Sequence, residues 1–574
     1  MDKISKKNQM INKRIKQLRN KFNQFNIDGY IVPKNDEFFS EYAVIDRLKI
    51  ISNFSGSAGL AVVLRKNNYL FVDGRYTIQA QQQSGKQFKI IEIHKFLPHK
   101  IIQNLTLGFD PSLITRKQLN VYFGNSLMLK QINKNLIDEI YKEKPSKTKT
   151  FFSLNNKVAG ETFKSKLNKI RNILKLNKAD YLFVSAPENV AWALNIRGSD
   201  NPNSPMPNCR LIIGKDKNLF LITQKEKVLK IIKDKKLSQK QIINPQKFED
   251  LIKNLKGNKF IIDPLSCSVL NENIIKSKFK IIIKNDPCYK LKAIKNSSEI
   301  KHMINAHIED GIALTKFIFW IKNINKKKIT EIDAQNKLEK FRKLNKNYLF
   351  PSFNTIAGAG SNGAIVHYRA LKKSNKIIKK NDIFLCDSGG QYKFGTTDVT
   401  RTICFSKQQK SIKNVFTKVL KGHIAVATYT LKKFTNGKQV DVKARQFLKK
   451  DGLDYAHGTG HGVGFFSNVH EGPQSISKYN TVKLERGMII SNEPGYYKKG
   501  HYGIRIENLV YIKKISKKLN FENLTLVPIE KDLINFNLLT NKEKNYLFLY
   551  HLNVYSKISK FLNNKERKWL ASLI

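Results

Sequence analysis

Two aspartates with the spacing of a β-hairpin are the residues of this sequence best suited to chemistry. Asp387 ends the alternating run Ile383–Asp387, and Asp398 lies in the run TDVTRTI. A strand, a turn around residues 388–395 and a returning strand would bring both side chains to one side. Two close carboxylates repel each other, so a buried pair is costly unless a shared proton or a metal ion neutralises it. Asp387 could instead accept backbone hydrogen bonds in a turn, but an acid inside a Thr/Val strand, such as Asp398, has no turn role.

Three downstream motifs add an imidazole and two more acids. HGTGHGVG contains His457 and His461, SNEPGYY contains Glu493, and GIRIENLV contains Arg505 and Glu507. The two aspartates, one histidine and the two glutamates form a five-ligand set suited to two divalent cations, because four carboxylates balance the charge of two dications. These oxygen-rich ligands favour Mn²⁺, although Co²⁺, Zn²⁺ or Fe²⁺ could also bind.

The histidines of HGTGHGVG are spaced like a helical zinc-peptidase motif, but their surroundings are not helical. His457 and His461 are four residues apart, and four glycines lie within the same motif. Glycine disfavours a helix, so we predict an extended segment whose backbone a ligand or substrate can approach closely. A lone histidine is more often a core residue than a ligand. His367 and His470 lie in the same part of the chain as the acids, which favours a role at the site.

The run YGIRIENLVYI predicts one buried strand over residues 502–512. Arg505 and Glu507 share one face of this strand by its period of two. Ile504 and Ile506 indicate that the strand is buried. A buried acid needs a partner, so this pair is better explained by a site than by an exposed surface.

Composition indicates a globular protein of several domains. The 574 residues include 41% hydrophobic residues, and a chain of this length fits about three or four domains. The formal net charge of +59 is spread along the chain together with abundant Ile and Asn. Compositional bias explains this charge better than a polyanion-binding surface, so we expect no specific nucleic-acid partner.

The cysteine content and the hydropathy of the sequence indicate the cellular compartment. The five cysteines are scattered and odd in number, which predicts reduced core thiols. The basic N-terminal segment has no apolar core of signal-peptide length, and no uncharged run approaches ~18 apolar residues. We therefore expect a cytoplasmic protein without membrane association.

The order of helical and strand patterns predicts an α/β and α+β protein with three domains. The N-terminal third opens with helical spacing at Ile11, Ile15, Leu18 and Phe22, and strand patterns follow. A similar order recurs later, which indicates two similar α/β domains at 1–152 and 153–292. The stretch KPSKTKT near residue 145 is a plausible linker between them. A catalytic domain at 293–574 contains every candidate ligand.

The motifs DSGGQY, TTDVTR, HGTGHGVG, NEPGYY and GIRIEN resemble those of the pita-bread metallopeptidases, and among them the long, three-domain form of aminopeptidase P (X-Pro aminopeptidase). SGSAGLAVVL, VDGRYTIQA, WALNIRGSD and TNKEKNYL also look like that family, so the resemblance spans nearly the whole chain. It implies two creatinase-like N-terminal domains before a pita-bread domain with a C-terminal extension. The first two domains would shape the substrate entrance and mediate contacts of a homodimer.

The resemblance also implies a role for each candidate residue. Asp387 would chelate one metal ion, His461 and Glu493 the other, and Asp398 and Glu507 would bridge both. A hydroxide shared by the two metals would attack the scissile carbonyl, and Glu493 would pass a proton to the leaving nitrogen. Three residues match the substrate histidines of the family: His367, His457 and His470. Two match its supporting and substrate-side positions: Arg505 and Tyr497.

The implied reaction is hydrolysis of the bond between an N-terminal residue and a following proline, and the substrates are peptides with proline in second position. A bond to proline is a tertiary amide without an N–H, so ordinary aminopeptidase sites handle it poorly. Two alternatives remain. The chain could be a prolidase, which cuts only X-Pro dipeptides, or a catalytically inactive pita-bread binding module. Inactive modules typically lose the metal ligands, whereas this sequence retains all five.

Overall fold

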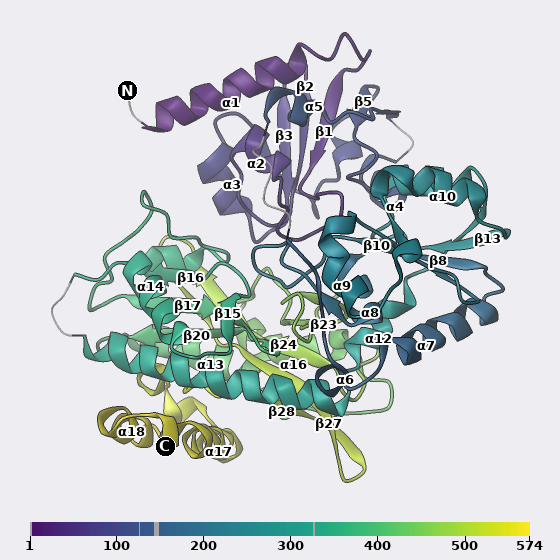
Figure 1. Ribbon diagram of the computed structural model, residues 1–574. Helices are drawn as coiled ribbons and strands as arrows, with labels where there is room; N and C mark the ends of the chain where they lie inside the picture. Colours follow the sequence, from purple (N-terminus) through teal and green to yellow (C-terminus); the bar gives the residue numbers. More distant parts are fainter. Residues whose placement is uncertain (1–2, 125–126, 143–148, 325–327) are drawn as a thin grey trace. The chain divides into compact units, whose positions relative to one another are not determined.

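The computed structural model describes residues 3–124, 127–142, 149–324 and 328–574. The chain forms two compact units (Figure 1), Met1–Asn155 with Glu161–Tyr289 and Asn156–Gly160 with Lys290–Ile574. Most of the predicted linker KPSKTKT lies outside the described residues. No helix in the described part of the chain has the length and apolar character needed to cross a membrane.

Two six-stranded sheets form the first unit. In spatial order, the first sheet consists of β4 (Lys89–Glu92), β3 (Asn68–Val72), β2 (Leu60–Leu64), β1 (Gly29–Pro33), β5 (Thr106–Phe109) and β6 (Met128–Gln131). The second consists, again in spatial order, of β12 (Ile242–Ile243), β11 (Leu219–Ile222), β10 (Arg210–Gly214), β8 (Tyr181–Val184), β13 (Lys259–Ile262) and β14 (Lys280–Ile283). The short strands β7 (Phe152–Ser153) and β9 (Ile196–Arg197) pair only with each other.

The two sheets share one topology. The central strand β1 is antiparallel to β2 and parallel to β5, and β8 is likewise antiparallel to β10 and parallel to β13. The outer pairs β3–β4 and β11–β12 are parallel in both sheets. The prediction of two similar α/β folds is therefore confirmed.

Helices accompany both sheets of the first unit. They are α1 (Lys3–Arg19), α2 (Arg47–Ser52), α3 (Thr77–Ser84), α4 (Arg116–Phe123), α5 (Leu136–Ile140), α7 (Phe163–Leu176), α8 (Pro187–Leu194), α9 (Leu229–Lys233), α10 (Phe248–Asn254) and α11 (Val269–Lys276). The apolar spacing at the N-terminus places Ile11, Ile15, Leu18 and Phe22 in the core, as predicted. All five cysteines are free and buried, which confirms the prediction of core thiols.

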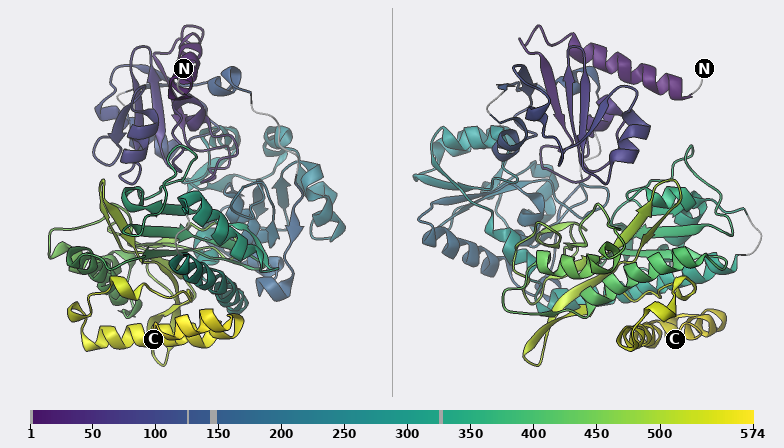
Figure 2. Two further views of the ribbon diagram at one scale, coloured as in Figure 1. Left: turned by 90° about the vertical axis from the view of Figure 1, so that its left-hand side faces the viewer. Right: turned by 180° about the vertical axis from the view of Figure 1, so that it is seen from behind.

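The second unit combines pairs of packed helices with several sheets. Its helices are α6 (Asn156–Ala159), α13 (Ser297–Asn323), α14 (Glu331–Lys343), α15 (Lys410–Ala427), α16 (Gly437–Lys449), α17 (Asn541–Ile558) and α18 (Asn564–Ala571), and α12 (Pro287–Ala293) leads into it. Helix α13 packs against α14, and α15 packs against α16. Helix α13 lies in front of the strands in Figure 1, and α15 and α16 lie in front in the view from behind in Figure 2.

The strands of the second unit form four sheets. In spatial order within each sheet, they are β15 (Tyr348–Pro351), β18 (Gly390–Tyr392) and β19 (Gly395–Thr396); β16 (Ile356–Ala359), β17 (Ile383–Ser388) and β20 (Val399–Cys404); β21 (Thr430–Leu431), β28 (Lys518–Asn523), β27 (Asn508–Ile515), β24 (Ile489–Asn492), β22 (Gly460–Gly462) and β23 (Glu471–Ile476); and β25 (Gly495–Lys498) and β26 (Tyr502–Arg505).

The predicted hairpin around residues 388–395 is present. Strands β17 and β20 pair antiparallel, and the small strands β18 and β19 form the end of the hairpin. A Cβ atom added at Gly389 would lie 2.0 Å from the carbonyl oxygen of Thr397. Glycine at this position is therefore what allows the two arms to approach so closely.

The prediction of one continuous strand over residues 502–512 is wrong, because the segment forms two strands. It divides at Ile506 and Glu507 into β26 and β27. The first part pairs with β25 and the second with β24 and β28, so the chain must change sheets between them. Glu507 lies at this break, and its backbone N–H donates to the carbonyl oxygen of Thr400 at 3.1 Å.

The fully buried Arg401 joins the C-terminal segment to the strands of the second unit. Its guanidinium donates to the carbonyl oxygens of Val527 and Pro528 at 2.7 and 2.9 Å and to the Tyr550 hydroxyl at 2.9 Å. It also donates to the carbonyl oxygen of Glu507 at 2.6 Å. One side chain thus ties helix α17 to the break between β26 and β27.

We expect Arg401→Met to destabilise the second unit, because buried oxygens that accept from Arg401 would lose their donor. The loss should be about 3 kcal/mol, which corresponds to a melting midpoint lower by about 5–10 °C. Calorimetry of the variant beside the exposed control Arg486→Met measures this difference. Equal midpoints for the two variants would contradict the assigned role.

Candidate metal centre

Asp387 and Asp398 lie on the same face of the β17–β20 hairpin. Asp387 stands directly opposite Thr400 in the register. Asp398 precedes Thr400 by two residues and lies directly before β20, so continuing the alternation of that strand by one residue places it on the same side. Both aspartates are buried. The structure therefore brings together the two acids that the sequence pattern pairs.

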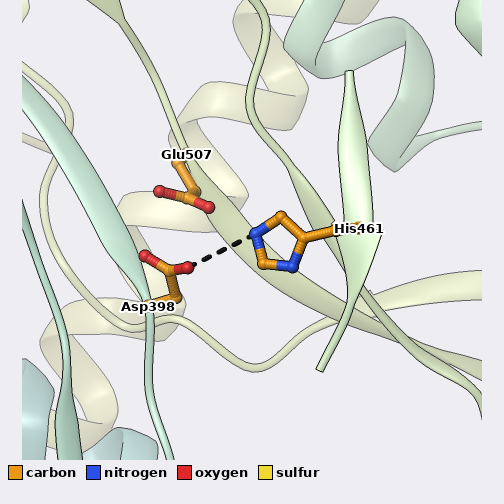
Figure 3. Close-up of side chains that lie close together, drawn as sticks. All are labelled: Asp398, His461 and Glu507. Carbon is orange, nitrogen blue, oxygen red and sulfur yellow. Dashed lines mark ion pairs between the residues drawn. The ribbon is translucent and has the colours of Figure 1, made fainter. Parts of the chain in front are cut away.

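Three further candidate ligands converge on Asp398. Asp398, His461 and Glu507 offer ligand atoms that all lie within 4.8 Å of one another, and their side chains point toward a common centre in Figure 3. Nε2 of His461 is 3.5 Å from Oδ2 of Asp398 and 3.5 Å from Oε1 of Glu493. Three carboxylates from separate segments thus surround one imidazole nitrogen.

The orientation of the His461 ring is suited to binding a cation. Its Nδ1 lies 3.0 Å from the carbonyl oxygen of Gly462, which can only accept a hydrogen bond. In the neutral ring, Nδ1 therefore carries the proton and the lone pair of Nε2 faces the carboxylates. A lone pair that faces carboxylates requires a proton or a metal ion between them.

The carboxylates also have unused oxygens. Among the described residues, Oδ1 of Asp387, Oδ1 of Asp398 and Oε1 of Glu507 are buried without a hydrogen-bond partner. Burial raises the pKa of Asp398 well above its usual range, and the charges of Asp387 and Glu493 add to this rise. Burial and the charges of Asp398 and Glu493 raise the pKa of Glu507 in the same way. Divalent cations would supply both the missing partners and the missing charge, so the residues present fit a two-cation site.

Arg505 and Tyr497 connect Asp387 to His457. The Arg505 guanidinium forms an ion pair with Asp387 at 2.6 Å and donates to the Tyr497 hydroxyl at 2.5 Å. Burial opposes the charge on Arg505, but Tyr497 and Asp387 raise its pKa, so it stays cationic. The Tyr497 oxygen is 2.8 Å from Nε2 of His457, whose Nδ1 is 2.7 Å from the carbonyl oxygen of Gly458. In the neutral ring, Nε2 of His457 therefore accepts from the Tyr497 hydroxyl.

His470 lies beside His461, with ring centroids 4.2 Å apart. The next residue, Glu471, is buried and forms ion pairs with Lys295 at 2.5 Å and Lys292 at 3.4 Å. Burial alone would raise the pKa of Glu471, but the two lysines hold it below its usual range. This buried charge cluster anchors the segment that carries His470.

His367 lies just beyond the short helix η5 (Gly360–Ala364) and is half-buried. The carbonyl oxygen of its neighbour Val366 accepts from Nη2 of Arg505 at 3.4 Å. The backbone beside His367 is therefore tied to the same guanidinium that pairs with Asp387.

At two positions of HGTGHGVG, glycine allows the close approach of another backbone segment, whereas the sequence predicted the approach of a ligand or substrate. The segment is extended as predicted, and Gly460–Gly462 form β22. A Cβ atom at Gly460 would lie 1.8 Å from the carbonyl oxygen of Ser491, and one at Gly462 would lie 2.1 Å from that of Glu471. These glycines allow the neighbouring strands β24 and β23 to pack against the segment.

Sequence reasoning missed Thr400. Its hydroxyl donates to Oε2 of Glu507 at 2.8 Å and accepts from Nε of Arg505 at 3.1 Å. The available signal was its spacing of two residues from Asp398 in the same strand pattern. Thr400 thus holds two functional candidates in place from the hairpin.

Family models match most of the chain. Residues 301–514 match the metallopeptidase family M24, and residues 517–573 match the C-terminal region of that peptidase family. Residues 14–126 and 142–299 each match the creatinase/prolidase N-terminal domain.

Relatives of known description match over almost their full length. A protein of Coprinopsis cinerea described as a probable Xaa-Pro aminopeptidase P is 35% identical, and the match covers 97% of each chain. Xaa-Pro aminopeptidase 1 of Dictyostelium discoideum is 36% identical over 98% of this chain and 96% of its own.

Solved structures give the same result. The X-prolyl aminopeptidase of Caenorhabditis elegans, described as a cytosolic enzyme with a di-nuclear active site, matches 98% of this chain and 99% of its own, with a TM-score of 0.91 and 31% identity. The prolidase of Pyrococcus horikoshii matches 64% of this chain and 99% of its own, with a TM-score of 0.52 and 25% identity. The chain belongs to the Xaa-Pro aminopeptidase P family, within the metallopeptidase family M24.

Proposed function

We propose that this protein is a metal-dependent aminopeptidase that hydrolyses the bond between an N-terminal residue and a following proline. One observation carries this proposal. Buried acids from separate segments converge on one imidazole, and an oxygen each of Asp387, Asp398 and Glu507 is buried without a partner among the described residues. Membership of the Xaa-Pro aminopeptidase P family supplies the reaction and the substrate class.

The proposed ligands of two divalent cations are Asp387, Asp398, His461, Glu493 and Glu507. Asp387 would hold one cation, His461 and Glu493 the other, and the remaining two acids would bridge them. When bound, such a cation pair supplies a water ionised near neutral pH and stabilises negative charge on the carbonyl oxygen. The oxygen-rich ligand set favours Mn²⁺ among the candidate metals. The di-nuclear site described for the C. elegans enzyme supports the number of ions.

Protein side chains would handle the proton and the substrate. Glu493 would accept the proton of the attacking water and pass it to the proline nitrogen, which must be protonated to leave. Hydroxyl donation from Tyr497 orients the ring of His457, which is proposed to contact the bound peptide. His470, whose ring lies beside that of His461, is proposed to contact the carbonyl being attacked or the proline ring. His367 is proposed as the third substrate histidine.

Arg505 would keep the charge of the site in balance. It neutralises part of the charge of Asp387 through its ion pair, and it holds Tyr497 through a second contact. We assign Arg505 and Tyr497 to orienting the ligands and the substrate, without direct contact to a metal ion.

The prolidase alternative is the weaker one. The aminopeptidase of C. elegans matches 98% of this chain, whereas the prolidase of P. horikoshii matches 64%. That prolidase therefore leaves about a third of this chain without a counterpart. An inactive binding module is disfavoured because all five candidate ligands are retained and the net charge is spread along the sequence.

Several finer expectations belong to the same proposal. We propose functional segments at 1–152, 153–292 and 293–574, a homodimer, and a cytoplasmic location. The family models divide the chain in a comparable order, and the C. elegans enzyme is described as cytosolic. No specific nucleic-acid partner is proposed.

We expect the Mn²⁺-loaded protein to release glycine from Gly-Pro-X tripeptides, because the cation pair and the acids act together. EDTA should abolish the release, and added Mn²⁺ should restore it. Asp398→Ala should lower kcat/KM at least about 100-fold, since it removes a proposed bridging ligand. Asp532→Ala, at a side chain 67% exposed, is the matched control. Full activity of Asp398→Ala, or no glycine release with Mn²⁺, would contradict the proposal.

A comparison of Gly-Pro-X tripeptides with the dipeptide Gly-Pro distinguishes the two enzyme alternatives. An aminopeptidase P should cut the tripeptide much faster, whereas a prolidase should cut only the dipeptide. Product release measured by chromatography for both substrates, with one enzyme preparation, gives the answer. A strict preference for the dipeptide would establish the prolidase alternative.

We expect Tyr497→Phe to lower kcat/KM by about 10- to 100-fold, because His457 and Arg505 both lose their contact with the hydroxyl. Mn²⁺ stoichiometry should stay unchanged, since Tyr497 is not a proposed ligand. Steady-state kinetics and metal analysis of the same samples test this, with Tyr496→Phe as the neighbouring control. A loss of bound metal in Tyr497→Phe, or unchanged kinetics, would rule out the assigned role.

A further inference from the structure

Asp310, in helix α13, is a buried acid that the proposed reaction does not use. Its side chain is only 4% exposed. It accepts hydrogen bonds from the Tyr392 and Thr397 hydroxyls, each at 2.8 Å. It also forms an ion pair with Arg342 of helix α14, in which Nε is 2.8 Å and Nη2 is 3.3 Å from the two carboxylate oxygens.

Arg342 extends this cluster to the other arm of the hairpin. Its Nη2 donates to the hydroxyl of Ser388 at 3.1 Å, and the whole side chain is 1% exposed. Burial opposes its charge, but Asp310 and Tyr392 raise the pKa of Arg342, so the guanidinium stays charged. The pair therefore contacts the residue that follows Asp387.

Thr397 connects the same pair to Asp398. Asp398 follows Thr397 directly and lies between β19 and β20, outside the ladder that pairs β17 with β20. The last paired residues of that ladder are Ser388 and Val399. Backbone pairing with β17 therefore does not reach Asp398. The hydrogen bond from the Thr397 side chain to Asp310 provides a contact beside Asp398 that the ladder does not.

We propose that Asp310 and Arg342 form a positioning pair that sets the separation of Asp387 and Asp398, and so permits two cations to bind together. This inference rests on the proposed two-cation function. Arg342 is hydrogen-bonded to Ser388 and Asp310 to Thr397, so the pair links the two arms of the hairpin next to Asp387 and Asp398. A bridging carboxylate must lie within reach of both ions, which makes the spacing of these two aspartates decisive.

The energetics of buried ion pairs support a positioning role. Removing two charges from water costs about as much as their attraction returns, so a buried pair adds little net stability. Shape-matched apolar residues often replace such a pair without loss of stability. The directional bonds to Tyr392, Thr397 and Ser388 are then what the charged pair provides and an apolar pair does not.

Variants of this pair can separate an effect on the position of the two aspartates from an effect on the stability of the fold. Asp310→Leu with Arg342→Met keeps the approximate shape of both side chains and leaves no unpaired charge. Thr397→Val keeps the shape of Thr397 and removes its hydroxyl, which donates to Asp310 at 2.8 Å and accepts from the backbone N–H of Gly390 at 2.9 Å. Lys322→Met is the control. Lys322 lies on helix α13 like Asp310, and it pairs with Glu530 at 2.7 Å, away from Ser388 and Thr397.

Calorimetric titration of each metal-free protein with Mn²⁺ measures stoichiometry and affinity, and electron paramagnetic resonance reports whether two bound Mn²⁺ ions are spin-coupled. We expect two ions per chain and a coupled signal for the unmodified protein and for Lys322→Met. The double variant and Thr397→Val should bind the second ion about 10- to 100-fold more weakly and show an uncoupled signal.

Each outcome either supports or overturns the positioning role of Asp310 and Arg342. Circular dichroism establishes that each variant is folded, and Thr397→Val carries the test if the double variant is not. Two tightly bound, coupled ions in the folded variants would overturn the positioning role while leaving the proposed function intact. Fewer than two ions in the unmodified protein would overturn the two-cation proposal and this inference with it.

Discussion

Repulsion among buried carboxylates is the constraint on which the second unit depends. Three acids lie around the imidazole of His461, and burial together with the charges of neighbouring acids, Asp387 among them, raises the pKa of Asp398 and Glu507. Arg505 neutralises only part of this charge through Asp387. An arrangement of this kind is stable in its ionised form only when cations lie between the acids. The metal requirement of the proposed reaction therefore follows from the charges that the fold buries.

The fold opposes this repulsion by anchoring each segment that carries a candidate residue. The hairpin with Asp387 and Asp398 is held by Asp310 and Arg342. The segment with His470 is held through Glu471 by two lysines. The loop around His457 is held by a third buried ion pair, in which Arg445 and Asp441 of helix α16 lie 2.7 Å apart. Arg445 also donates to the carbonyl oxygen of His457 at 2.6 Å. Buried ion pairs, most of them with a residue in a helix, thus anchor the hairpin and loops that carry these candidate residues.

Much of this site was predictable because strand periodicity acts over short distances. The alternation around Asp387 and Asp398 predicted a hairpin and a shared face, and both are present. The break at Glu507 was not predictable, since it arises from pairing with β25 on one side and β24 on the other. Asp310 lies in helix α13, which is distant from the hairpin in the sequence, and no local sequence pattern connects the two. Tertiary contacts of this kind become visible only in the structure.

The most direct test of this account is diffraction from a Mn²⁺-loaded crystal, with data collected at the manganese absorption edge. Two anomalous peaks per chain are expected, with Asp398 and Glu507 in contact with both and His461 in contact with one. A single peak, or peaks away from these side chains, would contradict the claim that paired cations hold the buried acids together.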